Sequence, residues 1–324
     1  MSGNSRRARA AGWLLTGPLP IPGICGIVAE YSKVLGGNCV LTLAGHTDYI
    51  TSLAALPDGK LASGSYDNTV RVWDPTLGVH AHMIAGDDRS VYIVALVALP
   101  GRDAVASGSC EKTVCVQEAS GDGDCLATLE GHRSKVTTLA VMPGGLLASG
   151  SWDTTVRVWD AASGECLLTL VGHAHFVNAL AVIPDGRLAS GSADGTVCVW
   201  DPNTGAGLSR FKCSHTSVNA LAGLPDGKLA SGSDDGAVRV WDVDTGACTS
   251  TLEGHTSSVM ALAVFPDGTL ASGSADHTVR VWNPATGTCL LTLAGHTGKV
   301  SALTVLPDGR LASGSWDRTV RVWE

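Results

Sequence analysis

The sequence predicts an all-β protein: a ring of seven four-stranded antiparallel units, closed by a strand from the beginning of the chain. Three observations predict this fold class. A Val-Trp pair recurs every 41 residues through the second half of the chain, each unit divides into four extended runs, and no helical period interrupts them. The chain has 40 glycines among 324 residues, enough for many turns.

The repeats occupy residues 39–324, and residues 1–38 form a separate N-terminal segment. Six repeats end on a tryptophan, and the spacing between these residues is 41 from Trp159 onward. The 86 residues between Trp73 and Trp159 leave room for one more copy, in which Gln117 takes the tryptophan position. The chain therefore contains seven repeats.

The third repeat illustrates the four extended runs. They are CLATL (125–129), KVTTLAVM (135–142), LLASGS (146–151) and TVRVW (155–159). Val, Thr and small apolar residues dominate the runs, and Pro-Asp-Gly or Gly-rich turns separate them. This composition is typical of short strands joined by tight turns.

The shared pattern GH…LPDG.LASGS.D.TVRVWD closely resembles the WD-repeat family of β-propellers. The resemblance implies that each repeat begins with the outermost strand of the preceding blade. The seventh blade then lacks its fourth strand at the end of the chain, and residues 39–43 are expected to supply it beside residues 319–322. The second copy diverges at Asp87, Glu111 and Gln117 but is expected to fold as a blade.

Six repeats contain a His, a Ser and an Asp in a fixed order, which are the residue types of a hydrolase triad. A catalytic site needs one such set over one cavity, whereas these sets recur around the ring, so no catalytic residue is predicted. The resemblance implies a structural hydrogen-bond chain to which Trp adds its indole N–H. Which Ser of each Ser-Gly-Ser takes part stays open. The predicted members of the chain are His46, Asp67, Trp73, His132, Asp153, Trp159, His173, Asp194, Trp200, His215, Asp235, Trp241, His255, Asp276, Trp282, His296, Asp317 and Trp323.

Cysteine placement and charge argue against other classes of function. Five cysteines precede the shared His by seven residues: Cys39, Cys125, Cys166, Cys248 and Cys289. They belong to outer strands of separate blades, so they cannot form a zinc site or a mutual disulfide. We therefore predict no metal, no cofactor, and a reducing compartment, either cytoplasm or nucleus. A formal charge of −8 disfavours nucleic acid, and no apolar run reaches membrane-spanning length.

The positions at which the repeats differ are the candidates for partner binding. The resemblance implies three variable positions per blade at one mouth of the channel: two flank the first Val of the innermost strand, and one precedes the turn Asp. Six of the ring's eight aromatic residues outside the repeated Trp fall there, and aromatic side chains on a rigid rim are typical interface anchors. Alternatively, some pack on one another or on the N-terminal segment. The predicted partner-binding residues are Tyr49, Tyr66, Tyr92, Lys135, Trp152, Phe176, Asn178, Asn219, Asp234, Met260, Lys299 and Trp316.

The N-terminal segment is expected to contain a short amphipathic helix. Its apolar face comprises Ile24, Ile27, Val28, Tyr31, Val34 and Leu35. The helix is expected to pack on the ring, and the alternative is that it binds a partner. The Leu-Pro that precedes it distantly resembles the beginning of an F-box, which implies a substrate adaptor of a ubiquitin ligase.

The whole sequence predicts a non-catalytic scaffold: a monomeric ring within a larger complex that binds protein or peptide partners at the channel mouth. Adaptor work in the ubiquitin pathway is the first interpretation, and a scaffold of signalling, chromatin or RNA-processing complexes is the alternative. A propeller hydrolase is a third hypothesis, for which only Asp87, Asp88 and Glu111 of the second repeat offer catalytic groups.

Overall fold

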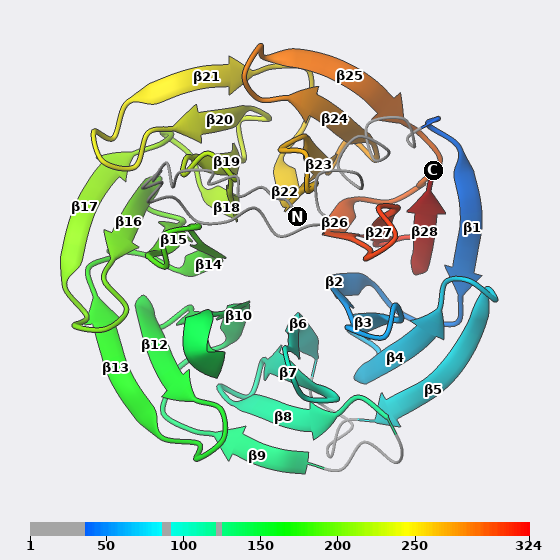
Figure 1. Ribbon diagram of the computed structural model, residues 1–324, viewed down its shortest axis with the longest axis horizontal. Helices are drawn as coiled ribbons and strands as arrows, with labels where there is room; N and C mark the ends of the chain where they lie inside the picture. The colour runs from blue at the N-terminus through cyan, green and yellow to red at the C-terminus, as the bar shows by residue number, and fades with distance from the viewer. Residues whose placement is uncertain (1–35, 86–91, 121–124) are drawn as a thin grey trace, which may run out of the picture.

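A computed structural model describes residues 36–85, 92–120 and 125–324 and shows seven four-stranded sheets arranged in a ring (Figure 1). Every strand pair within the sheets is antiparallel. The predicted all-β seven-bladed propeller is therefore confirmed. One 3₁₀ turn, η1 (Pro143–Gly145), is the only helical element in the described ranges.

Each blade uses consecutive strands from the channel outward, except the last. Blade 1 contains β2 (Ile50–Ala55), β3 (Leu61–Ser65), β4 (Thr69–Asp74) and β5 (Val79–Ala85). Blade 2 contains β6 (Ile93–Leu99), β7 (Ala104–Ser109), β8 (Val114–Glu118) and β9 (Cys125–Leu129). Blade 3 contains β10 (Val136–Val141), β11 (Leu146–Ser151), β12 (Thr155–Asp160) and β13 (Cys166–Val171). Blade 4 contains β14 (Val177–Val182), β15 (Leu188–Ser192), β16 (Thr196–Trp200) and β17 (Gly207–Lys212).

The remaining blades complete the ring. Blade 5 contains β18 (Val218–Gly223), β19 (Leu229–Ser233), β20 (Val238–Trp241) and β21 (Cys248–Leu252). Blade 6 contains β22 (Val259–Val264), β23 (Leu270–Ser274), β24 (Val279–Asn283) and β25 (Thr288–Leu293). Blade 7 contains β26 (Val300–Val305), β27 (Leu311–Ser315), β28 (Thr319–Trp323) and β1 (Cys39–Ala44).

The two ends of the ring close blade 7 as the repeat offset implies. β1 pairs with β28, and Leu43 lies opposite Val320 in the register. Two backbone hydrogen bonds continue the ladder beyond the strands, from Asn38 N to Glu324 O (3.1 Å) and from Glu324 N to Asn38 O (3.0 Å). β28 therefore has no open edge that could pair with another chain. Figure 1 shows β1 beside β28 at the outer rim.

Neighbouring blades pack closely because the second strand of each blade carries a glycine at the contact. A Cβ at Gly150 of β11 would lie 2.7 Å from Val177 Cγ1 of blade 4, which is too short for a real contact. The corresponding contacts with the next blade occur at Gly64, Gly108, Gly191, Gly232, Gly273 and Gly314. The last of these faces Ile50, so blade 7 meets blade 1 in the same way. The hydrophobic core is therefore a series of clusters between adjacent blades rather than one central mass.

Some predictions concern residues outside the described ranges. The amphipathic helix expected within residues 24–35 is one of them, and the candidate hydrolase carboxylates Asp87 and Asp88 are two more. Among the residues that are described, no helix is long and apolar enough to cross a membrane.

Candidate functional site

Blade 3 displays the repeated hydrogen-bond chain in full. His132 Nδ1 lies 2.8 Å from Asp153 Oδ2, and His132 Nε2 lies 2.7 Å from Ser149 Oγ. Trp159 Nε1 donates to the same Ser149 Oγ at 2.7 Å. An ionised carboxylate can only accept, so His132 Nδ1 donates to Asp153; with the proton on Nδ1 alone, Nε2 accepts from the serine hydroxyl. Each polar atom of this chain therefore has a partner.

The same chain recurs in blades 1, 4, 6 and 7, although in blade 4 the distance from His173 Nδ1 to Asp194 Oδ2 lengthens to 3.4 Å. The distance from His Nε2 to Ser Oγ is 2.7 Å in each. The first serine of each Ser-Gly-Ser takes part, which resolves the alternative that the sequence left open. The second serine instead forms hydrogen bonds with the loop before the innermost strand and with the turn Asp. Ser151 Oγ donates to Ser134 O (3.0 Å) and accepts from Asp153 N (3.0 Å).

In this hydrogen-bond chain, burial and hydrogen bonding shift the pKa values of the Asp and His side chains in opposite directions. Burial alone would raise the pKa of Asp276, but hydrogen bonds from Thr278, His255 and the Thr256 backbone lower it to about 2. The pKa of Asp153 is held well below its usual range against the same burial, with His132 and Thr155 as side-chain donors. Burial lowers the pKa of His255 against the attraction of Asp276. In blade 6 these shifts favour a carboxylate at Asp276 and a neutral imidazole at His255 near neutral pH.

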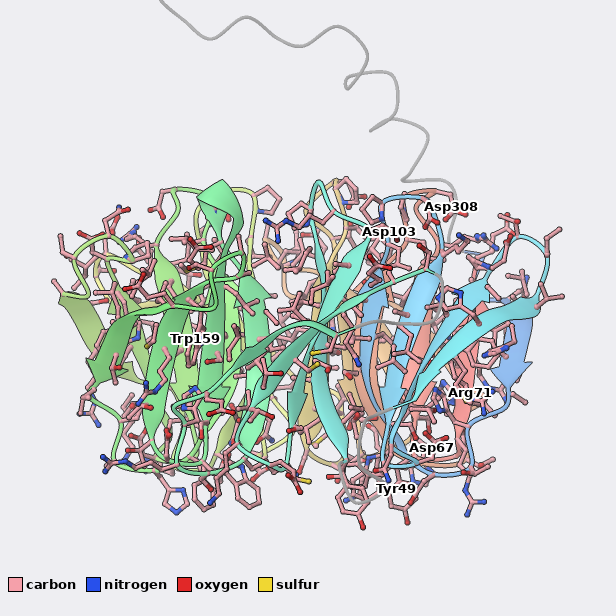
Figure 2. The ribbon with its side chains drawn as sticks, turned by 90° about the horizontal axis from the view of Figure 1, so that it is seen from below. Tyr49, Asp67, Arg71, Asp103, Trp159 and Asp308 are labelled. Carbon is pink, nitrogen blue, oxygen red and sulfur yellow. The ribbon has the colours of Figure 1, made fainter. Side chains whose placement is uncertain are left out.

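These sets are poorly suited to nucleophilic catalysis. Ser149 is 0% exposed, and its hydroxyl already contacts both His132 and the Trp159 indole. A nucleophile must reach a substrate atom at about 3–3.5 Å, which a fully buried hydroxyl in this position does not allow. In Figure 2, Trp159 lies within the thickness of the ring rather than at either face.

In blade 5, one predicted member of the hydrogen-bond chain is wrong. His215 is exposed, and Ser214 occupies the position that histidine holds in the other chains. Ser214 Oγ donates to Asp235 Oδ2 at 3.2 Å, and Arg239 Nη2 approaches the same carboxylate at 2.8 Å. The assignment of His215 was wrong: the other histidines stand four residues before their innermost strand and 21 before the turn Asp, and in blade 5 Ser214 rather than His215 keeps both spacings. Trp241 still donates to its serine, Ser231, at 2.8 Å.

Blade 2 folds without a comparable chain among its described residues. Gln117 is buried at the tryptophan position, 5% exposed. Glu111, at the turn Asp position, is exposed, and its backbone N–H donates to Ser109 Oγ at 3.2 Å. Divergence of the motif has therefore removed polar interactions but kept all four strands.

The backbone of each blade brings two of its variable positions together at one mouth of the channel. Trp152 N donates to Lys135 O at 3.0 Å, and Trp316 N donates to Lys299 O at the same distance. Tyr66 N likewise donates to Tyr49 O at 3.0 Å. The residue before the innermost strand is thus tied to the residue before the turn Asp. Figure 2 shows Tyr49 at this face and Asp103 and Asp308 at the opposite face.

Six of the predicted residues at this mouth form two groups of ring contacts. Trp316 stacks on Tyr49 with ring centroids 4.6 Å apart, and the Tyr66 ring lies 6.3 Å from Tyr49. Tyr66 also contacts Tyr92, at 5.0 Å. Further along the mouth, Trp152 stacks on Phe176 at 4.5 Å. We call these residues the aromatic arc: Tyr49, Tyr66, Tyr92, Trp152, Phe176 and Trp316.

Two lysines complete the arc. Lys135 Nζ lies 5.5 Å from the Tyr66 ring centroid and 5.0 Å from that of Trp152, so it bridges the two aromatic groups. Lys299 Nζ lies 4.4 Å from the Trp316 ring centroid. All three distances are typical of cation–π contacts. The arc thus extends over blades 7, 1, 2, 3 and 4, and Tyr49, Tyr92 and Trp152 keep 36%, 46% and 39% of their surface exposed.

The other predicted mouth residues do not join the arc. Asn178 Nδ2 donates to Ser217 Oγ (2.9 Å) of blade 5, and Asn219 Nδ2 donates to Asp234 Oδ1 (2.6 Å). Together with Met260, both asparagines line the central channel, a cavity of about 190 Å³. These residues form the polar part of the mouth and connect adjacent blades.

Sequence reasoning missed one residue at this mouth. His175 is exposed, and its ring contacts Phe176 at a centroid distance of 4.2 Å, so it extends the aromatic surface of blade 4. The sequence offered one signal for this residue, because His175 directly precedes Phe176, a variable position. Among the described residues, no group of three or more His, Cys, Asp or Glu side chains could hold a metal ion.

Comparison with known proteins agrees with this architecture. A family model described as WD domain, G-beta repeat matches residues 37–74, 123–160, 164–201, 208–242, 246–283 and 287–324. The chain is 33% identical to a ribosome biogenesis protein WDR12 homolog from Anopheles gambiae over 137 residues, which is 41% of the chain and 31% of that protein. It is 34% identical to nuclear distribution protein PAC1-2 from Uncinocarpus reesii over 173 residues, which is 47% of the chain and 37% of that protein. It is also 34% identical to periodic tryptophan protein 2 from Arabidopsis thaliana over 130 residues, 40% of the chain and 14% of that protein. The chain thus spans well under half the length of these relatives.

Proposed function

This chain belongs to the WD40-repeat family, and from that premise we propose that it is a non-catalytic scaffold that binds a protein or peptide partner on the aromatic arc. The observation that carries the proposal is the arc itself: six aromatic side chains in two contacting groups, bridged by Lys135, at one face of a rigid ring. Aromatic anchors with few rotatable bonds lose little entropy on binding and dominate interface energies.

The charges along the arc suggest the chemistry of the partner. Lys299 and Lys135 lie against rings near one end and the middle of the arc, and neither ammonium group has an ion-pair partner among the residues that the structure describes. A partner segment with apolar or aromatic side chains and nearby carboxylates would contact both the rings and the two lysines. Asp234, in the polar part of the mouth, would repel the same carboxylates and so set the orientation of the segment.

The names of the relatives favour work in a multiprotein assembly over a single enzymatic reaction. Those proteins are named for ribosome biogenesis and for nuclear distribution, and we infer a comparable scaffold role in the cytoplasm or nucleus. A ubiquitin-pathway adaptor depended on the Leu-Pro and helix before residue 36, which lie outside the described residues. No observation favours it over the general scaffold role.

Affinity purification from the native cell tests the proposal. The protein is compared with a Trp152→Ala, Trp316→Ala double variant, which removes one anchor from each half of the arc. The matched control is Leu167→Ala, Leu208→Ala, which truncates two exposed apolar side chains on outer strands (46% and 52% exposed). A partner recovered with the wild type is then titrated as a purified fragment.

We expect the arc variant to lose the partner and the control to retain it. Truncating an anchor typically costs about 2 kcal/mol or more, which corresponds to a loss of affinity of about 30-fold. Melting curves of the purified variants establish that both remain folded. Recovery of the same partners with the same affinity by the folded arc variant would show that the arc is not the binding surface.

A further inference from the structure

Blade 2 places two thiols side by side on its outer strands. Cys115 lies on β8 and Cys125 on β9, and their Sγ atoms are 3.3 Å apart. Both are present as thiols rather than as a disulfide. Cys125 is exposed and Cys115 is half-buried, so one sulfur is accessible to solvent and the other lies directly behind it.

The other blades show that this pair replaces a different contact. Where blade 2 has Cys115, blades 3, 6 and 7 have an arginine whose Nη1 lies 3.5, 3.8 and 3.7 Å from the outer-strand cysteine. The arginines are Arg157, Arg280 and Arg321. In blade 4 the same position is Cys198, but the outer strand has Gly207, in register with Trp200, where blade 2 has Cys125. Among the seven blades of the described chain, only blade 2 has cysteine at both positions.

The local geometry allows the two sulfurs to bond. β8 and β9 are antiparallel neighbours, with Cys115 opposite Thr128 and Gln117 opposite Cys125. A disulfide needs an S–S distance of about 2.05 Å, so the sulfurs must approach by a little over 1 Å. β9 is the outermost strand and pairs only with β8, and the register is already irregular between Val116 and Gln117. Small side-chain rotations with a slight shift of this edge strand suffice.

We propose that Cys115 and Cys125 form a reversible disulfide and that this pair is an oxidative modification site of the protein. The oxidant is a low-molecular-weight disulfide such as glutathione disulfide. The Cys125 thiolate attacks one sulfur of that disulfide and releases one glutathione thiolate. The Cys115 thiolate then attacks Cys125 Sγ in the mixed disulfide and releases the second glutathione. Two protein thiols lose two electrons and two protons, and one glutathione disulfide becomes two glutathione thiols.

The position of the pair suggests what its oxidation does. Blade 2 lacks the His–Ser–Trp chain that ties the strands of five other blades. A covalent link from β8 to β9 would hold its outer strand in place when the surroundings become oxidising, which is the condition under which intracellular disulfides form. The pair lies at the outer rim, away from the aromatic arc, so the inference does not depend on the proposed function.

Titration of the full-length protein in glutathione buffers tests the proposal. Samples equilibrated at increasing ratios of glutathione disulfide to glutathione are quenched in acid, alkylated and analysed by peptide mass spectrometry. Cys166 is the internal control for an outer-strand cysteine beside an arginine. Cys198 is the control for a cysteine at the Cys115 position with no cysteine on the outer strand beside it, and burial raises the pKa of its thiol to about 11.

We expect a cross-linked peptide that contains Cys115 and Cys125 and has lost two hydrogens. It should appear at about tenfold less glutathione disulfide than is needed to glutathionylate Cys166, because the second step is intramolecular. Its disulfide-to-dithiol ratio should change tenfold for about 30 mV, as for a two-electron couple. In Cys115→Ser, Cys125 should behave like Cys166 and form only the mixed disulfide.

Two results would overturn the proposal. One is a wild-type protein in which Cys125 accumulates as the glutathione mixed disulfide at the same ratio as Cys166. The other is a Cys115→Ser variant in which the oxidation of Cys125 is unchanged. Because the first result is read on the wild type, it does not depend on whether a variant folds.

Discussion

Removal of the turn aspartate should destabilise blade 3 much more than blade 5, although the substitutions are chemically identical. In blade 3, Asp153 accepts from His132 Nδ1 (2.8 Å), Arg133 N (2.8 Å) and both N–H and Oγ1 of Thr155 (3.0 and 2.6 Å). The His132 side chain is only 1% exposed. Asp153→Ala therefore leaves the buried Nδ1–H with only the distant Thr155 Oγ1, at 3.5 Å, as an acceptor.

The magnitude follows from these contacts. A buried donor left without a partner costs about 1–3 kcal/mol, and each further hydrogen bond that is lost contributes about 0.5–1.5 kcal/mol. The Arg133 backbone N–H lies at an exposed residue and can bond to water instead. We therefore expect Asp153→Ala to lower the free energy of unfolding by about 2–4 kcal/mol.

Asp235→Ala in blade 5 is the matched control. Asp235 has no imidazole to orient: it accepts from Ser214 Oγ at 3.2 Å and pairs with Arg239, and its side chain is 30% exposed. An ion pair with this exposure contributes about 0–1 kcal/mol, and the groups that lose it can be hydrated. We expect a loss of about 1 kcal/mol in the free energy of unfolding.

Urea denaturation followed by tryptophan fluorescence measures both losses. The midpoint should fall clearly further for Asp153→Ala than for Asp235→Ala, with an unchanged slope m for each. Equal shifts in midpoint, or a larger shift for Asp235→Ala, would refute the argument that the buried imidazole determines the cost of losing the aspartate.

Three further predictions follow from the same structure. Acid should destabilise the fold in two stages. Below about pH 6.5 the unfolded chain binds protons that the buried His255 resists, because burial lowers the pKa of His255; below about pH 4 the stabilising contribution of Asp276, whose pKa is about 2 in the folded chain against an ordinary value of 3.8, is lost as the pH falls toward 2. Melting temperatures across this range check the sign, and a flat profile would contradict it. Thr154 adopts φ = 72°, a left-handed conformation that disfavours β-branched residues, so Thr154→Gly should raise the free energy of unfolding by up to about 1 kcal/mol in urea titrations rather than lower it. Deletion of residues 1–44 removes β1 and opens the edge of β28, so size-exclusion chromatography should show concentration-dependent association, whereas a stable monomer would argue that closure by β1 is dispensable.

Much of the architecture could be predicted because its causes are local and repeated. Alternating Val residues before each Trp specify a strand with one buried face, and Pro-Asp-Gly specifies the turn before the next strand. Seven copies of these signals leave little freedom in the number of blades. The aromatic positions at the mouth could be placed for the same reason, since each lies at a constant offset from a strand or from a turn Asp.

The sequence by itself determined the ring, its seven blades, the closing strand and the positions that reach the mouth. Only the tertiary structure decided that the aromatic residues of separate blades join into one arc and that Cys115 faces Cys125. These outcomes depend on the register between strands and on the direction of single side chains. A shift of one residue reverses which face a side chain occupies, and a linear pattern with a constant period does not record which residues of neighbouring strands come to lie opposite each other.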